Sequence, residues 1–91
     1  MKYELVATSR FRKDVKRLQK QGLPMEELFS ALDELLAGEE LSPRYRDHAL
    51  SGKYTGFREC HIRPDWLLIY LVSEKELILT ASRTGSHSDL L

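Results

Sequence analysis

The sequence predicts an α+β domain with two layers, in which a pair of helices covers a β-sheet. Two amphipathic segments lie in the first half of the chain, and three strand-like segments lie in the second half. With 91 residues, the chain suits a single domain over residues 1–91 with one hydrophobic core. We therefore expect a helical hairpin packed against a short antiparallel meander.

The chain is expected to begin with a half-buried strand, because apolar and polar side chains alternate over residues 2–8. The first helix follows, with Thr8 or Ser9 as its N-cap and Gly22 at its end. Three apolar residues at helical spacing mark its buried side: Phe11, Val15 and Leu18.

A second helix is expected between Pro24 and Gly38. Glu26 and Glu27 fall in its first turn, where the helix dipole favours negative charge. Its apolar residues share one side: Met25, Leu28, Leu32, Leu35 and Leu36. The short connection between the two helices predicts a hairpin.

The second half of the chain alternates between loop and strand signals. Residues 39–53 have no apolar period and are expected to form an ordered loop. Strands are expected at 54–63, 66–72 and 77–83, and the apolar run of the middle one is typical of a central strand buried on both faces. The tail at 84–91 is expected to add a short turn or helix.

Charge is balanced overall but unevenly placed along the chain. The 14 Lys and Arg residues equal the 14 Asp and Glu residues. Residues 10–20 hold six basic side chains and one acid, whereas residues 26–40 hold six acids and no base. The molecule is therefore expected to have a positive side and a negative side.

Several classes of protein are excluded or disfavoured. Cys60 is the only cysteine, so no disulfide can form within the chain, and a reducing cytoplasmic location is expected. The longest apolar run has seven residues, which predicts neither a signal peptide nor a membrane span. The sequence also has no glycine-rich phosphate loop, paired-cysteine metal motif or nucleophile elbow.

The three histidines are the candidate catalytic residues. His61 and Arg63 are expected on the open face of a predicted strand, away from the helices. Arg83 can lie beside His61 if it faces the same way, with His87 close by. Cleavage of RNA by its own 2'-hydroxyl needs a base, an acid and a cation on the phosphate. Histidine and arginine supply these groups at neutral pH without a metal.

Each of these residues also has a plainer interpretation. A surface histidine is usually only a polar side chain, and Asp65 after a proline is an ordinary turn residue. Trp66 opens a core strand, so packing is its default role and stacking on a base is the alternative. Histidine spacings of 13 and 26 residues match no short zinc motif, so a metal site is not expected.

Three motifs in this order closely resemble YafQ-type toxins of the RelE superfamily: Asp47-His48-x-Leu50-x-Gly52, then Gly56-Phe57-Arg58-x-x-His61-x-x-Pro64-Asp65-Trp66-Leu67-Leu68-Ile69-Tyr70, then Arg83-Thr84-Gly85-Ser86-His87. The resemblance implies a RelE-like fold and a ribosome-dependent endonuclease that cleaves messenger RNA. It further implies the toxin half of a bacterial type II toxin–antitoxin pair, with a cognate antitoxin as partner and no cofactor.

The resemblance also implies which residues line the active site: His48, His61, Asp65, Trp66, Arg83 and His87. His87 is then expected to act as general base, and His61, assisted by Asp65, as the acid or its orienting partner. Arg83 would hold the scissile phosphate, while His48 and Trp66 would position substrate. Binding to ribosome and message would rest on the first helix and on further basic residues: Arg44, Arg46, Lys53, Arg58 and Arg63.

Two features depart from the family pattern. The aromatic residue that the family has near its C-terminus is either replaced here by Leu91 or lost, which puts base stacking at that point in doubt. This chain is also neutral, whereas many relatives are basic.

Two other functions stay open at this level. One is a toxin of the same fold without nuclease chemistry, which binds a target such as gyrase, as ParE-type relatives do. The other is a plain interaction module whose histidines are incidental.

Overall fold

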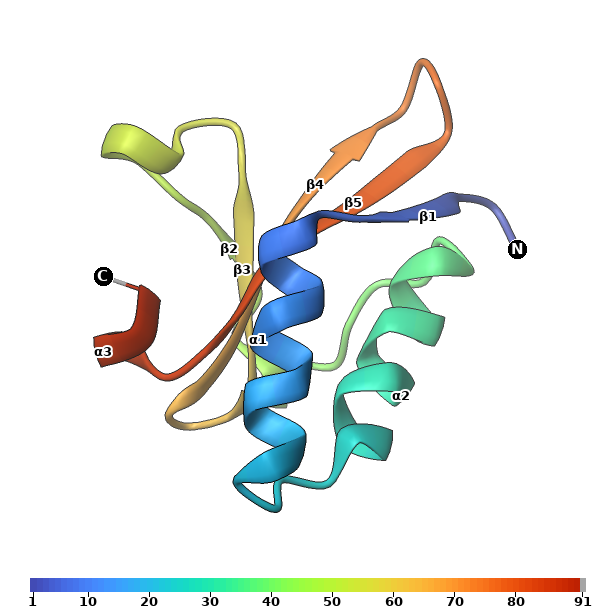
Figure 1. The fold of residues 1–91 in the computed structure, drawn as a ribbon. Helices are drawn as coiled ribbons and strands as arrows, with labels where there is room; N and C mark the ends of the chain where they lie inside the picture. Colours follow the sequence, from blue (N-terminus) through green and yellow to red (C-terminus); the bar gives the residue numbers. More distant parts are fainter. Residues whose placement is uncertain (91) are drawn as a thin grey trace.

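Two helices follow the first strand of the computed structural model, which describes residues 1–90 (Figure 1). Strand β1 (Glu4–Ala7) leads into α1 (Ser9–Lys20), where Thr8 Oγ1 accepts the N–H of Phe11 as the predicted N-cap. Helix α2 (Met25–Leu36) runs beside α1. The predicted helical hairpin is thereby confirmed.

The other strands complete a five-stranded sheet in the order β1-β5-β4-β3-β2. They are β2 (His48–Ala49), β3 (Arg58–Arg63), β4 (Trp66–Ser73) and β5 (Ile78–Gly85). Strand β1 pairs parallel to β5, and the other neighbours pair antiparallel. A short helix, α3 (His87–Leu90), follows β5. The predicted meander and C-terminal helix are thus confirmed.

The segment expected to be a loop is more regular than its sequence suggested. It contains a 3₁₀ turn at Pro43–Tyr45 and the two-residue strand β2, and a second 3₁₀ turn at Gly52–Tyr54 extends just past it. The second 3₁₀ turn and Gly56, which has φ +95°, interrupt the extended backbone. Strand β3 therefore begins at Arg58 and not at residue 54, where it was expected. Such short elements leave no apolar period that a sequence pattern can detect.

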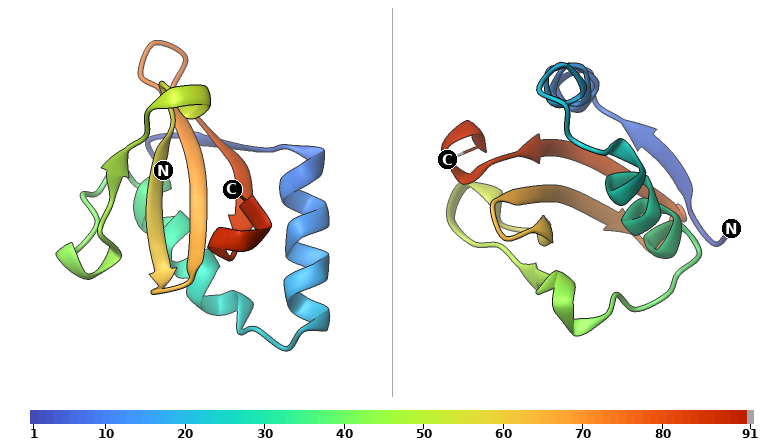
Figure 2. Two further views of the ribbon diagram at one scale, coloured as in Figure 1. Left: turned by 90° about the vertical axis from the view of Figure 1, so that its left-hand side faces the viewer. Right: turned by 90° about the horizontal axis from the view of Figure 1, so that it is seen from below.

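Strand β4 separates two apolar clusters. Leu68 and Tyr70 face the main core under α1 and α2, while Leu67 and Ile69 join Leu90 of α3 in a smaller cluster. The central strand is therefore buried on both faces, as predicted. Helix α3 and the second 3₁₀ turn lie on the opposite side of the sheet from α2 (Figure 2).

No helix within residues 1–90 is long and apolar enough to cross a membrane. Cys60 is a free thiol buried in the main core. Burial raises the pKa of this thiol to about 12.

Candidate active site

Strand register brings three polar side chains of β2 and β3 together. His48 pairs with Glu59, Glu59 pairs with Ile69 of β4, and His61 pairs with Leu67 of β4. Directly paired residues point to the same face of a sheet. All five side chains therefore share the face opposite α2, where Leu67 and Ile69 form the smaller cluster.

His48 has two partners that both accept hydrogen bonds. Its Nδ1 lies 2.8 Å from the carbonyl oxygen of Arg46, and its Nε2 lies 3.0 Å from Oε2 of Glu59. A carbonyl oxygen can only accept, so Nδ1 carries a proton, and an attractive contact between Nε2 and the carboxylate needs a second one. Both contacts can be hydrogen bonds at once only when a proton also lies between Nε2 and the carboxylate. Glu59 is buried, whereas His48 is exposed.

His61 lies between the other two histidines. Its ring centroid is 6.1 Å from that of His48 and 5.9 Å from that of His87. The Nδ1 atom of His61 lies 3.3 Å from the carbonyl oxygen of Pro64, which makes Nδ1 the donor and Nε2 the basic nitrogen. The structure thus brings all three predicted histidines together.

His87, the first residue of α3, is held by Asp65 in the turn between β3 and β4. Oδ1 of Asp65 accepts both the backbone N–H of His87, at 3.0 Å, and its Nδ1–H, at 2.6 Å. These bonds hold the pKa of Asp65 below its usual range, because they stabilise the carboxylate. With Nδ1 protonated, Nε2 of His87 is the basic nitrogen. Asp65 was expected to assist His61, but its contacts are with His87.

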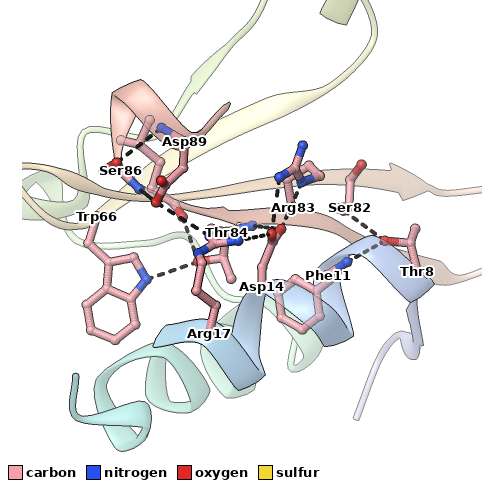
Figure 3. Close-up of polar contacts among 11 residues, drawn as sticks. Thr8, Phe11, Asp14, Arg17, Trp66, Ser82, Arg83, Thr84, Ser86 and Asp89 are labelled. Atoms are coloured by element: carbon pink, nitrogen blue, oxygen red, sulfur yellow. Dashed lines mark hydrogen bonds and ion pairs between the residues drawn. The ribbon is translucent and has the colours of Figure 1, made fainter. Parts of the chain in front are cut away.

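Arg83 shares the face of the histidines but turns its guanidinium to the edge of the sheet. It pairs with Ile69, two residues along β4 from the partner of His61. Its Nε and Nη2 donate to Asp14 of α1 at 2.8 and 3.1 Å (Figure 3). Arg83 therefore lies one pair of same-face residues along the sheet from His61, and its hydrogen bonds to Asp14 of α1 fix its guanidinium.

Arg63 was expected beside His61 on the open face, and this prediction is wrong. The register of β3 and β4 shifts between His61 and Arg63, so that Arg63 pairs with Trp66. Such a bulge changes the face on which the next side chain lies. Arg63 turns toward α2 and donates to both carboxylate oxygens of Glu27, at 3.0 and 2.6 Å.

Arg58 also points away from the histidines. It pairs with Tyr70, on the face of β4 that packs under the helices, and donates to Oδ2 of Asp47 at 3.1 and 3.3 Å. Arg58 therefore does not reach the histidines, and its expected contact with ribosome or message stays a prediction.

Trp66 lies in the main core and is only 3% exposed. Its Nε1–H donates to Oγ1 of Thr84 at 3.0 Å. A buried indole offers no face to a base, so the structure favours the packing role over stacking.

Arg46 and Lys53 remain available as substrate contacts, because both side chains are exposed. Arg46 lines a pocket of about 280 Å³ together with Arg44 and His61. Leu91, the position of the family aromatic, lies outside the described residues.

Two residues of this region were not among those predicted from the sequence. Glu59 precedes His61 by two positions and so shares its face of the strand, a signal that was present in the alternation. Asp14 lies in a run of basic residues on another element, and no spacing connects it with Arg83.

A metal ion could be held by His48, Glu59 and His61, whose three ligand atoms all lie within 4.8 Å of one another. Two imidazoles and a carboxylate are ligands that zinc and copper accept. An ion there would compete with a proton for Nε2 of His48 and the carboxylate of Glu59, which lie 3.0 Å apart. The histidine spacings alone could not indicate this group, because Glu59 supplies its third ligand.

Comparison with known proteins points to one family. Residues 3–91 match the family described as the bacterial toxin of type II toxin–antitoxin system, YafQ. The mRNA interferase toxin YafQ of Escherichia coli K12 is 37% identical over 84 residues, which cover 91% of this chain and 89% of the relative.

Solved structures agree with this match. A metal-bound toxin from Helicobacter pylori has a TM-score of 0.92 and 38% identity, covering 98% of this chain and 99% of that one. The E. coli DinJ–YafQ complex has a TM-score of 0.90 and 34% identity, covering 98% of each chain. The fold and its histidine site therefore define a RelE-like toxin. The chain belongs to the YafQ family of toxins from type II toxin–antitoxin systems.

Proposed function

We propose that this protein is a metal-independent endoribonuclease that cleaves messenger RNA on the ribosome and thereby inhibits translation. The observation that carries the proposal is the cluster of three histidines with the Asp65–His87 pair. Its E. coli relative is named an mRNA interferase toxin, which supports the same activity.

His87 is proposed as the general base. Its Nε2 would take the proton of the 2'-hydroxyl, and the oxygen would then attack the adjacent phosphorus. Asp65 holds the ring through Nδ1 and stabilises the imidazolium that forms.

His61 is proposed as the general acid. In its protonated form it would deliver a proton to the 5'-oxygen as the bond from phosphorus to that oxygen breaks. The products are a 2',3'-cyclic phosphate and a 5'-hydroxyl. Arg83 would stabilise the negative charge on the phosphate. A proton shared by His48 and Glu59 would make this pair a hydrogen-bond donor beside His61.

The antitoxin partner is also proposed by relation to the family. A relative has been crystallised in complex with DinJ. We propose that a cognate antitoxin binds this toxin and blocks or disrupts the histidine site.

The test is cleavage of a defined message in purified translation complexes, with naked RNA as control. We compare the wild type with His87→Ala and with Ser88→Ala, a neighbouring exposed position outside the proposed chemistry. Loss of the general base is expected to lower the rate by about 100-fold or more, while Ser88→Ala keeps it.

Three results would overturn parts of the proposal. No cleavage by a folded wild type would favour a toxin that acts by binding. Equal cleavage of naked RNA would remove the ribosome from the mechanism. Undiminished cleavage by His87→Ala would remove His87 as the base.

A further inference from the structure

Asp14 of α1 is a buried acid with three partners. Its carboxylate accepts Nε–H and Nη2–H of Arg83, Nη1–H of Arg17 at 2.9 Å, and the backbone N–H of Thr84 at 3.1 Å (Figure 3). Only 2% of the residue is exposed. A buried carboxylate normally costs free energy, so these contacts must compensate for its lost hydration.

The position of Asp14 follows from the sheet. Strand β1 ends at Ala7, which pairs with Ala81, so no strand borders β5 beyond that point on this side. The N–H of Thr84 would lack an acceptor there, and Asp14 supplies one. The carboxylate is therefore anchored to the backbone of β5 and cannot follow movements of the Arg83 side chain.

This anchoring fixes the orientation of Arg83. Nε and one Nη2 hydrogen point at Asp14, which leaves the Nη1 edge of the guanidinium for another ligand. Arginine binds phosphate through just such a pair of parallel N–H groups. The side chain of Arg83 is 15% exposed, so part of it remains accessible.

The same carboxylate orients Arg17, which reaches the segment that carries His87. Nη2 of Arg17 donates to the carbonyl of Thr84 at 3.3 Å and to Oδ2 of Asp89 at 3.4 Å. Asp89 in turn accepts the N–H of Ser86, the residue before His87, at 3.0 Å.

Gly85 allows the side chains of Arg17 and Asp89 to lie close to the backbone of β5. It adopts φ +152°, and a Cβ built there would lie 2.8 Å from Nη2 of Arg17 and 2.9 Å from Oδ2 of Asp89. No larger side chain fits without displacing one of these groups.

We propose that Asp14 is a positioning residue of the nuclease site, which holds Arg83 with its free edge toward the scissile phosphate and, through Arg17, steadies the start of α3. This inference rests on the proposed function. Burial by itself would raise the pKa of Asp14, but hydrogen bonds from Arg83, Thr84 and Arg17 outweigh it and lower the pKa. The carboxylate is thus ionised at neutral pH and can act as a fixed negative charge.

The test is a double-mutant cycle in ribosome-dependent cleavage, with the variants Asp14→Asn, Arg83→Ala and the combination of both. Asp33→Asn serves as the matched control, because Asp33 is an exposed acid of α2. Thermal unfolding of every variant is recorded, and cleavage is measured at a temperature where all are folded.

If Asp14 acts through Arg83, Asp14→Asn lowers kcat about 10- to 100-fold while KM for programmed ribosomes changes little. In the Arg83→Ala background the same substitution lowers kcat by clearly less than in the wild type, because only the effect through Arg17 remains, and Asp33→Asn has no effect. A purely structural role would instead give equal losses in both backgrounds.

The experiment distinguishes failure of the positioning role from failure of the proposed function. Equal losses in both backgrounds, or an unchanged kcat in the folded Asp14→Asn variant, overturn the positioning role alone. A folded wild type that cleaves nothing overturns the proposed function, and the inference about Asp14 falls with it.

Discussion

Asp65 binds His87 at two points, the backbone N–H and the imidazole Nδ1–H, with one carboxylate oxygen. The first bond fixes the start of α3 against the turn between β3 and β4, and the second fixes the tautomer of the ring. A neutral amide in place of this carboxylate could not stabilise an imidazolium formed during proton transfer. The orientation of the proposed base therefore depends on a turn residue.

Asp65→Asn is expected to lower the cleavage rate by at least about 100-fold, because the amide loses the charge and can present N–H to Nδ1. The pKa of Asp65 lies below its usual range, so the wild-type carboxylate stays ionised throughout the neutral range. A loss should thus be present at both pH 6 and pH 8, because Asp65 itself does not titrate between them. Ser88→Ala is the control, and a loss confined to one end of that range would contradict the role of Asp65.

For individual residues, the sequence could predict the residue types of the site but only some of their contacts. The three histidines were predicted to be functional and do lie together. The side of the sheet on which Arg63 lies depends on a bulge that alternation cannot reveal. The partner of Asp65 depends on how α3 folds back, which is a long-range contact.

Helix α1 has one buried side and one exposed basic side. Phe11 and Leu18 pack into the main core, and Asp14 reaches the edge of β5. The other side carries exposed basic residues, and Lys13, Lys16 and Lys20 line one shallow surface with Arg17. Because Arg17 belongs to the internal network, the three lysines are the basic side chains of this shallow surface that can meet RNA phosphates.

Replacing Lys13, Lys16 and Lys20 together by Gln is expected to weaken binding to ribosomes and to flatten its salt dependence. If each lysine contacts one phosphate, the slope of log K against log salt falls by roughly two to three. The control is Lys75→Gln, an exposed lysine between β4 and β5. An unchanged slope in the triple variant would mean that another surface binds the ribosome.

Elements with strong periodicity were predicted well, and short ones were not. The helices at Ser9–Lys20 and Met25–Leu36 follow their apolar spacing and their end signals. Strand β2 has two residues and is defined only by its pairing with β3. The parallel pairing of β1 with β5 joins the two ends of the chain, and no local pattern contains that information.

In the whole molecule, one face of the sheet contributes to the main core and the other carries the proposed catalytic groups. One face packs under α1 and α2, and the opposite face carries the smaller cluster together with the histidines. The strands that carry His48 and His61 are thus held by a core to which those side chains do not belong. This arrangement explains how a chain of 91 residues can fix several polar groups near one another.

The most direct measurement of the central claim is the chemical identity of the cleaved ends. Message cut by the wild type in purified translation complexes is analysed by mass spectrometry for its 3' end, with and without a chelator at a level that leaves the ribosomes intact. Acid–base catalysis by the histidines predicts a 2',3'-cyclic phosphate or its 3'-phosphate hydrolysis product, a 5'-hydroxyl on the other fragment, and cutting that survives the chelator. A 3'-hydroxyl, or cutting that stops when metal is removed, would contradict the account.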